Sequence, residues 1–195
     1  DSLAKASGSH LAGHLLFADL AERTGKADYV RRVDAAAALG FDKASGVARE
    51  AMPFHNRMSD AVFMSCPILV KAAKLTGKRE YLDMALRHYR FMRALDMRAD
   101  GLWRHSPQDE SAWGRGNAFA LLGLALTLED LPRDHAAFEE MLTDFRTHSA
   151  ALVRQQTSDG MWRQIVDDSD SYREYTATAM IGTAMLKGIR RGWLS

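Results

Sequence analysis

The sequence has little cysteine and proline, no surplus of charge of either sign, and no long apolar run. Its one cysteine, Cys66, excludes an internal disulfide and a zinc site made of several cysteines. The 26 basic and 25 acidic residues nearly cancel, which argues against a surface that binds nucleic acid through net positive charge. The longest apolar stretches, such as residues 118–128, are too short to cross a bilayer, so we expect no membrane partner.

Metal and cofactor motifs are also missing. His10 and His14 have the i, i+4 spacing of a helical metal site, but no glutamate lies between them and no third ligand is evident. Residues 114–116 place a glycine on either side of an arginine but lack the preceding strand of a dinucleotide-binding loop. The sequence therefore predicts neither a bound metal nor a cofactor.

Apolar residues recur at helical spacing through almost the whole chain. The first apolar face ends at Thr24, before Gly25, a residue typical of helix ends. Residues 160–166 are predicted to form a short extended segment, and no strand-rich region is evident. The predicted class is all-α, with helices up to residue 24 and at 29–39, about 59–75, around 81–89, 118–128, 135–155 and 174–190.

Two short sequence motifs (words) each occur twice along the chain. Residues 24–29 (TGKADY) recur as residues 76–81 (TGKREY), and residues 100–104 (DGLWR) recur as residues 159–163 (DGMWR). In each unit a helix ends in a tight turn, a second helix returns, and a longer loop leads onward. The long loops should therefore gather on one face, as in an α/α toroid or solenoid, and that face is the expected site.

The ends of the sequence suggest a processed or partial chain. Seven predicted helices are too few to close a barrel of six helical hairpins. The chain begins with Asp1 and not with methionine, shows no signal sequence, and ends at Ser195 just after an apolar pair. We expect residues 1–195 to be a single α/α-barrel domain that lacks N-terminal and C-terminal helices. The sequence is compatible with the cytoplasm or the periplasm of a bacterium.

Candidate functional side chains lie in three loops on the same predicted face, at residues 52–60, 102–107 and 111–119. Aromatic rings stack on the CH-rich faces of sugars, and arginine pairs bidentately with a carboxylate. Together with histidines and a carboxylate, these side chains are suited to binding an acidic sugar. The candidates are His55, Asp60, His105, Trp113, Arg115 and Phe119.

Several candidates also have a structural alternative. Asp60 stands at a helix start, where aspartate commonly caps free backbone N–H groups. Arg115 lies close in sequence to two acidic residues and so suits a structural ion pair. Trp113 at a helix entrance suits core packing, and His105 suits an ordinary loop histidine. The sequence alone leaves these alternatives open.

Six short motifs of the sequence occur in an order and spacing known from a protein family: residues 58–64, 76–77, 101–105, 113–117, 160–164 and 176–180. In these words the chain resembles the unsaturated rhamnogalacturonyl and glucuronyl hydrolases of glycoside hydrolase families 105 and 88. The resemblance implies an (α/α)6 barrel of six hairpins. It also implies oligosaccharide substrates that pectin (rhamnogalacturonan) or glycosaminoglycan lyases leave and that end in a 4,5-unsaturated uronic acid, with the rhamnogalacturonan or pectin type expected here. It also implies hydration of the C4=C5 double bond, which departs from the usual two-carboxylate scheme of glycosidases.

Asp60 matches the catalytic acid/base of that family, which protonates C4 and then helps to deprotonate the water that adds at C5. A free aspartate has a pKa near 3.9, so at pH 7 only about one molecule in a thousand carries the proton. Burial against Phe63 and Trp113 would raise the pKa of Asp60, and the helix N-terminus would lower it. We therefore expect a mildly acidic optimum.

The resemblance also implies roles in substrate binding. Arg115 would hold the uronate carboxylate, and Trp113 would stack on the sugar ring. His105 would hydrogen-bond a hydroxyl or the carboxylate. Phe119 stands where many relatives carry another aromatic residue, usually tryptophan, and His55 is a further candidate for binding the substrate.

One position departs from the family pattern. Many members carry a second aspartate at the start of the first helix, in a pattern like Asp-His-x-x-x-Gly. The matching stretch here is residues 9–13, with Ser9 in place of the acid, so the role of that carboxylate is weakened or moved. Two alternatives stay open: a non-catalytic helical-repeat module that binds glycan or protein, and another α/α-barrel enzyme such as a uronate lyase or a sugar epimerase.

Overall fold

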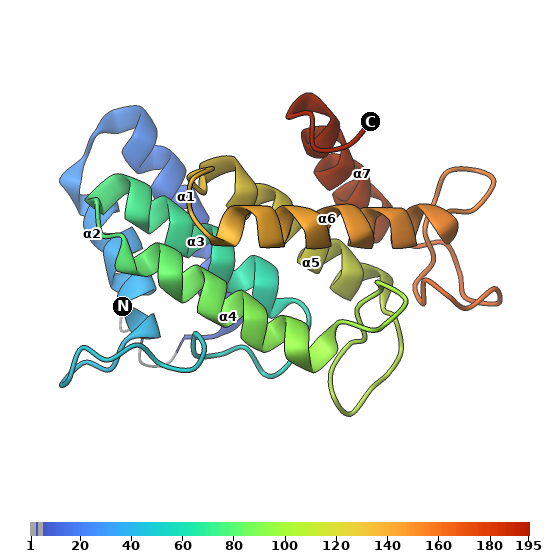
Figure 1. Cartoon of the computed structure of the whole chain (residues 1–195), viewed down its shortest axis with the longest axis horizontal. Coiled ribbons are helices and arrows are strands. Elements are labelled where there is room, and N and C mark those ends of the chain that lie inside the picture. Colours follow the sequence, from blue (N-terminus) through green and yellow to red (C-terminus); the bar gives the residue numbers. More distant parts are fainter. Residues whose placement is uncertain (1–2, 4–5) are drawn as a thin grey trace.

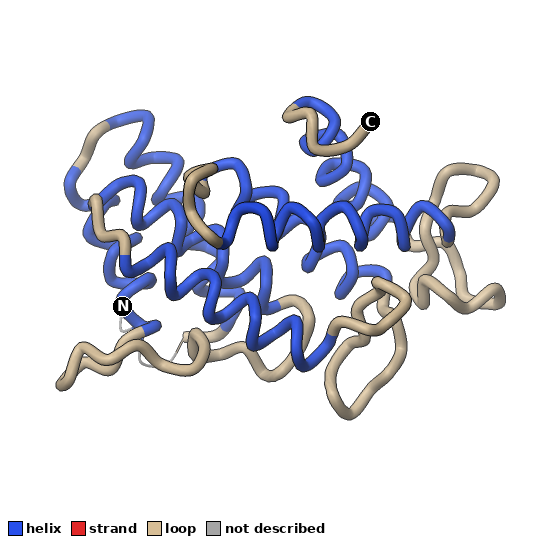
Figure 2. Tube along the Cα trace, viewed as in Figure 1, coloured by secondary structure: helices blue, strands red, loops and turns tan. Residues whose placement is uncertain are grey.

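The computed structural model describes residue 3 and residues 6–195, and its regular structure is helical. The described part contains isolated β-bridges but no named strand (Figure 2). None of the described helices is long and apolar enough to cross a lipid bilayer. The all-α prediction is confirmed. The described helices are α1 Gly8–Thr24, α2 Ala27–Ala37, followed by a 3-10 turn at Ala38–Gly40, then α3 Ala61–Thr76, α4 Glu80–Asp96, α5 Gly114–Asp130, α6 Ala137–Arg154 and α7 Tyr175–Arg190.

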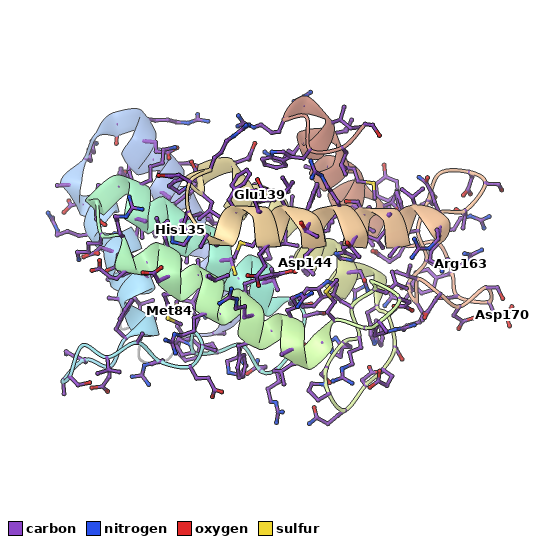
Figure 3. The ribbon with its side chains drawn as sticks, viewed as in Figure 1. Met84, His135, Glu139, Asp144, Arg163 and Asp170 are labelled. Carbon is purple, nitrogen blue, oxygen red and sulfur yellow. The ribbon has the colours of Figure 1, made fainter. Side chains whose placement is uncertain are left out.

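The helices alternate between two layers, as in an α/α barrel (Figure 1). Helices α1, α3, α5 and α7 pack side by side in that order and form the inner layer. Helix α2 packs against α1 and α3, α4 against α3, and α6 against α5, which forms the outer layer. Hydrogen bonds from Tyr89 and Arg93 on α4 to Asp144 on α6 tie two outer helices together. Asp144 is labelled in Figure 3.

The long loops that follow α2, α4 and α6 gather at one end of the helices, as predicted, and the short turns lie at the other end (Figures 1 and 2). Backbone hydrogen bonds join these loops to one another. The Ser59 N–H donates to the His105 carbonyl at 3.1 Å, and the Val166 N–H donates to the Ala112 carbonyl at 2.8 Å. The loops therefore form one continuous surface over the ends of the inner helices.

The repeated DGLWR and DGMWR words fold alike. The glycine of each word has a positive φ, 87° and 82°, a conformation that favours glycine. Each following tryptophan is buried, and its backbone N–H donates to a side chain of the next inner helix. Trp103 donates to Asn117 Oδ1 on α5 at 2.8 Å, and Trp162 donates to Thr178 Oγ1 on α7 at 3.0 Å. The sequence repeat is thus a structural repeat.

Helix α5 begins at Gly114, whereas the apolar pattern predicts a start at residue 118. The two glycines of residues 114–116 weaken the helical signal in the sequence. In the folded chain the Gly114 N–H donates to the Gln164 carbonyl at 2.7 Å, a long-range contact that the local pattern does not contain. Residues 160–166, predicted to be extended, pair only through isolated bridges, one of which joins Ile165 to Trp113.

Helix α5 approaches α3 closely because Gly123 has no side chain. A Cβ atom at this position would lie 2.7 Å from both the backbone nitrogen and the Cα of Phe63. That contact is closer than atoms can pack, so any side chain here forces the two inner helices apart. By contrast, a Cβ atom at Gly182 on α7 would have nothing within 4 Å.

We expect Gly123→Ala to destabilise the protein by about 1–3 kcal/mol, because the added methyl group overpacks the contact between α3 and α5. Gly182→Ala is the matched control, since it replaces a helical glycine in open space and is expected to stabilise the protein by about 0.5–1 kcal/mol. Chemical denaturation measures both free energies of unfolding. Equal effects of the two substitutions would contradict the described packing.

Candidate active site

Asp60 directly precedes α3 and lines a small pocket. Its backbone has helical angles (φ −55°, ψ −26°), and its carboxylate makes no capping hydrogen bond. The capping alternative is therefore wrong. The pocket has a volume of about 200 Å³ and is also lined by residues of the N-terminal segment and of the loop before α3, among them Ser9 and His55.

Burial raises the pKa of the Asp60 carboxyl above its ordinary value, since a charge is poorly solvated there. The positive charges of His105 and Arg115 oppose this effect and lower the pKa, but burial is the larger influence. Two residues that the sequence predicts for the site, His105 and Arg115, therefore lie within electrostatic range of Asp60.

The start of α5 approaches Asp60 through Gly116. A Cβ atom at this glycine would lie 2.7 Å from Ser59 Oγ and 3.6 Å from Asp60 Oδ1. The preceding residue, Arg115, is exposed, and its Nη1 donates to Gln164 Oε1 at 3.0 Å. The ion-pair alternative for Arg115 is wrong, because its recorded side-chain partner in the described part of the chain is a neutral amide.

Trp113 is partly exposed and lies outside the hydrophobic core, so the core-packing alternative is wrong. Its Nε1 donates to Asp109 Oδ2 at 2.9 Å, which fixes the polar edge of the indole. The centroid of its ring lies 5.8 Å from that of the His105 ring. The two rings are thus neighbours beside Asp60, and part of the indole surface is open to solvent.

His105 is anchored through its backbone. Its N–H donates to the Ser111 carbonyl at 3.0 Å, and its carbonyl accepts a hydrogen bond from the Ser59 N–H. These two bonds fix the loop before α5 against the start of α3. The ring Nδ1 is buried, and no residue in the described part of the chain hydrogen-bonds to it.

Phe119 and His55 occupy different positions relative to the pocket. Phe119 lies further along α5, and its ring centroid is 5.2 Å from that of Phe63 on α3. Of the predicted site residues, Asp60 and His55 line the pocket, whereas His105, Trp113, Arg115 and Phe119 are not among its lining residues. The ring of His55 makes an edge contact with Phe91, and burial lowers the pKa of His55, which favours the neutral imidazole.

The Asp60 pocket is lined by Ser9, the residue that stands where the family pattern has a second aspartate. Ser7 and Ser9 line one wall, and their Oγ atoms are 2.9 Å apart. The chain therefore brings hydroxyl groups to the Asp60 pocket where the family pattern predicts a carboxylate. The facing loop is strained, because three of its non-glycine residues have a positive φ: Phe54, Asn56 and Arg57.

Asn117 positions the site, although the sequence alone predicts no role for it. It is fully buried, and its Nδ2 donates to the Trp103 carbonyl at 2.8 Å and to the Trp113 carbonyl at 3.0 Å. Its Oδ1 accepts the Trp103 N–H and lies 3.1 Å from His148 Nε2. The available signal was a polar residue at the start of an otherwise apolar helix.

The side chains around Asp60 thus include an imidazole, an indole and a guanidinium. Among the described residues, no group of three or more histidine, cysteine, aspartate or glutamate side chains is arranged to hold a metal ion. A carboxyl group with a raised pKa can donate and accept a proton, and a guanidinium can bind a carboxylate. The arrangement is suited to acid–base chemistry on an anionic ring.

Two curated proteins are similar in sequence to this chain. An unsaturated 3S-rhamnoglycuronyl hydrolase of Formosa agariphila is 30% identical over 157 residues, which are 69% of this chain and 41% of that protein. An unsaturated rhamnogalacturonyl hydrolase of Bacillus subtilis is 27% identical over 136 residues, which are 66% of this chain and 40% of that protein. The chain therefore spans about two fifths of the length of these relatives.

A solved structure and a family profile extend the comparison. A glycosyl hydrolase family 88 protein from Bacteroides vulgatus superposes with a TM-score of 0.87 and 20% identity, over 96% of this chain and 56% of that chain. This similarity confirms the predicted α/α-barrel fold. Residues 3–195 match the profile of Glycosyl Hydrolase Family 88. The chain belongs to that family.

Proposed function

We propose that this protein is a glycoside hydrolase that releases a 4,5-unsaturated uronic acid from the non-reducing end of lyase-generated oligosaccharides of the rhamnogalacturonan or pectin type. The observation that carries the proposal is the Asp60 carboxyl, which lines a pocket, caps no helix and is within range of the charges of Arg115 and His105. The hydrolases named above support the class of substrate.

In the proposed reaction Asp60 donates its proton to C4, and the electron pair of the C4=C5 bond forms the new C–H bond. The ring oxygen stabilises the positive charge that develops at C5, and water adds there. The water gives a proton back to Asp60, so the acid is regenerated. The resulting hemiketal opens, C1 becomes an aldehyde, and the aglycone leaves as an alcohol.

The environment of Asp60 supports its role as a proton donor. A carboxyl group is a useful acid only where an appreciable fraction holds its proton at the working pH. Burial raises the pKa of Asp60, and each unit of increase raises the protonated fraction about tenfold at neutral pH. Because His105 and Arg115 limit this increase, we expect the optimum to be mildly acidic.

The neighbouring side chains supply binding. Arg115 is exposed and pairs with the uronate carboxylate, and Trp113 stacks on the unsaturated ring. His105 hydrogen-bonds a hydroxyl or the carboxylate. His55 lines the Asp60 pocket and is a further contact for the substrate, and Phe119, which packs against Phe63, adds an aromatic ring further along α5.

We expect Asp60→Asn to lower kcat by roughly 10²–10⁴-fold, because the amide cannot donate the proton to C4. Asp83→Asn, at a residue of α4 whose side chain is 79% exposed, is the control and should leave kcat unchanged. Loss of the ultraviolet absorbance of the conjugated C4=C5 group, measured on an unsaturated disaccharide, reports turnover.

Three outcomes of this assay would contradict the proposal. Unchanged turnover by Asp60→Asn would show that Asp60 is not the proton donor. A gain of absorbance with a saturated uronate polymer, and no loss with the disaccharide, would indicate a lyase. Saturable binding of the disaccharide without turnover by the unsubstituted protein would indicate a non-catalytic glycan-binding module.

Arg115→Gln should raise KM by about 10- to 100-fold, because one charged hydrogen-bonded contact to the substrate is lost. The same substitution removes a positive charge that lowers the pKa of Asp60. The alkaline decline of kcat/KM should therefore move to higher pH, since the acid then keeps its proton longer. Initial rates across a pH series measure both effects.

The control for this experiment is Arg31→Gln, which removes an exposed arginine of α2 that pairs with Asp28. It should change neither KM nor the pH profile. A methyl ester of the substrate adds a second control, because Arg115→Gln should raise KM only slightly for an uncharged ester. An equal loss with acid and ester would show that Arg115 does not bind the uronate carboxylate.

A further inference from the structure

Gln164, in the loop between α6 and α7, is a buried polar residue that the mechanism above does not use. Its Oε1 accepts the hydrogen bond from Arg115 Nη1 at 3.0 Å. Arg115 belongs to the first turn of α5, so this bond joins the loop before α7 to the helix that carries the candidate substrate-binding arginine. Gln164 is 9% exposed, whereas Arg115 is exposed, and the amide therefore forms the buried side of the contact.

The backbone of Gln164 is fixed on two sides. Its carbonyl accepts the Gly114 N–H at 2.7 Å, and its own N–H donates to the Tyr172 carbonyl at 2.8 Å. Two residues further on, the Val166 N–H donates to the Ala112 carbonyl at 2.8 Å. These bonds hold the loop against the start of α5 without using the amide side chain of Gln164. That side chain is therefore free to act on Arg115 alone.

The partner of Arg115 is neutral, which leaves the positive charge of the guanidinium uncompensated. A guanidinium carries five N–H donors, and an amide oxygen that accepts one of them adds no opposing charge. In the described part of the chain, no acceptor is recorded for the other N–H groups of Arg115. Arg90 on α4 differs, because its Nε and Nη2 both donate to the carboxylate of Glu140, at 3.0 and 2.6 Å.

The acid that lies closest to this contact in sequence has another role. Glu174 is the N-cap of α7, and its carboxylate accepts the backbone N–H groups of Thr176 and Ala177 at 3.2 and 2.5 Å. Its side chain is thereby held at the start of α7. The neutral amide of Gln164, and not this carboxylate, is the recorded side-chain partner of Arg115.

We propose that Gln164 is a positioning residue that orients the Arg115 guanidinium for the carboxylate of the substrate and makes the site selective for an anionic sugar. One N–H of the arginine is fixed by the amide, and the remaining donors and the full positive charge are left for a bidentate pair with the uronate. A carboxylate at position 164 would orient the guanidinium equally well but would neutralise it. This inference rests on the proposed function and assigns the selectivity to a residue outside the Asp60 pocket.

The test compares KM for the unsaturated disaccharide and for its methyl ester in Gln164→Met, whose side chain has a similar length but cannot accept the Arg115 bond. We expect KM for the acid to rise by about 3- to 10-fold, because one hydrogen bond that orients the guanidinium is lost. Neither kcat nor KM for the ester should change by more than about 2-fold. Gln156→Met is the matched control, since that amide bonds to the Gly160 carbonyl in the same loop and should leave both KM values unchanged.

Two further variants separate positioning from a merely structural role. In a protein that already carries Arg115→Gln, the added Gln164→Met should not raise KM for the acid further, because the guanidinium that it positions is gone. Gln164→Glu should raise KM for the acid about as much as Arg115→Gln does, because the new carboxylate pairs with Arg115. An equal rise for acid and ester in Gln164→Met, an unchanged KM in Gln164→Met or Gln164→Glu, or the same rise with and without Arg115 would overturn the proposal.

A readout that does not depend on turnover is the rotation of the Arg115 guanidinium about its Nε–Cζ bond, measured by nitrogen NMR. Arg115→Gln assigns the signal, because its resonance disappears. Gln164→Met should speed this rotation several-fold and Gln156→Met should not, since only the first removes a bond that restrains Nη1. An unchanged rotation in Gln164→Met would refute the positioning role. A faster rotation in a protein that does not turn over the disaccharide would refute only the proposed function.

Discussion

The geometry of the site depends on the buried amide of Asn117. A single side chain hydrogen-bonds both the N–H and the carbonyl of Trp103 and the carbonyl of Trp113. It thereby holds the segment that carries His105 and the residue that presents the indole. An aspartate could not donate the two N–H bonds, and a leucine would leave the buried N–H and carbonyl of Trp103 without partners. The backbone positions of Trp103 and Trp113, next to which His105 lies, depend on this contact.

The repeat in the chain shows how a site arises from a common frame. In the later unit Thr178 takes the place of Asn117 and accepts the Trp162 N–H, but a hydroxyl cannot supply the second donor that an amide has. The first unit therefore carries the cross-linked loops, the indole and the arginine beside Asp60. The same helix–loop–helix scaffold thus carries the candidate active site in one unit and not in the other.

Much of the fold could be predicted from the sequence because it depends on local signals. The helical periodicity, the glycines that end helices, and the repeated words give the helices and the common face of the long loops. The start of α5 could not be predicted, because the hydrogen bond from Gly114 to the Gln164 carbonyl joins residues far apart in the chain. Local composition contains no information about such a partner.

The site was predictable only in part, for a related reason. Asp60, His105, Trp113 and Arg115 belong to recognisable words, and the folded chain brings them together. Asn117 stands at the start of an apolar helix, and its role follows only from hydrogen bonds to residues distant in the sequence, Trp103 and His148. The pKa of a carboxyl such as that of Asp60 likewise depends on burial and on long-range hydrogen bonds, and the neighbouring residues in the sequence reveal neither.

The central claim is that Asp60 delivers a proton to one face of C4 of an unsaturated uronic acid. The most direct measurement is the reaction in D₂O, quenched early and analysed by NMR of the released sugar. The account predicts one deuterium at C4, in a single stereochemical position, because a fixed carboxyl donates from one side. A released sugar that retains its C4=C5 double bond, or that carries deuterium equally in both positions at C4, would contradict the claim.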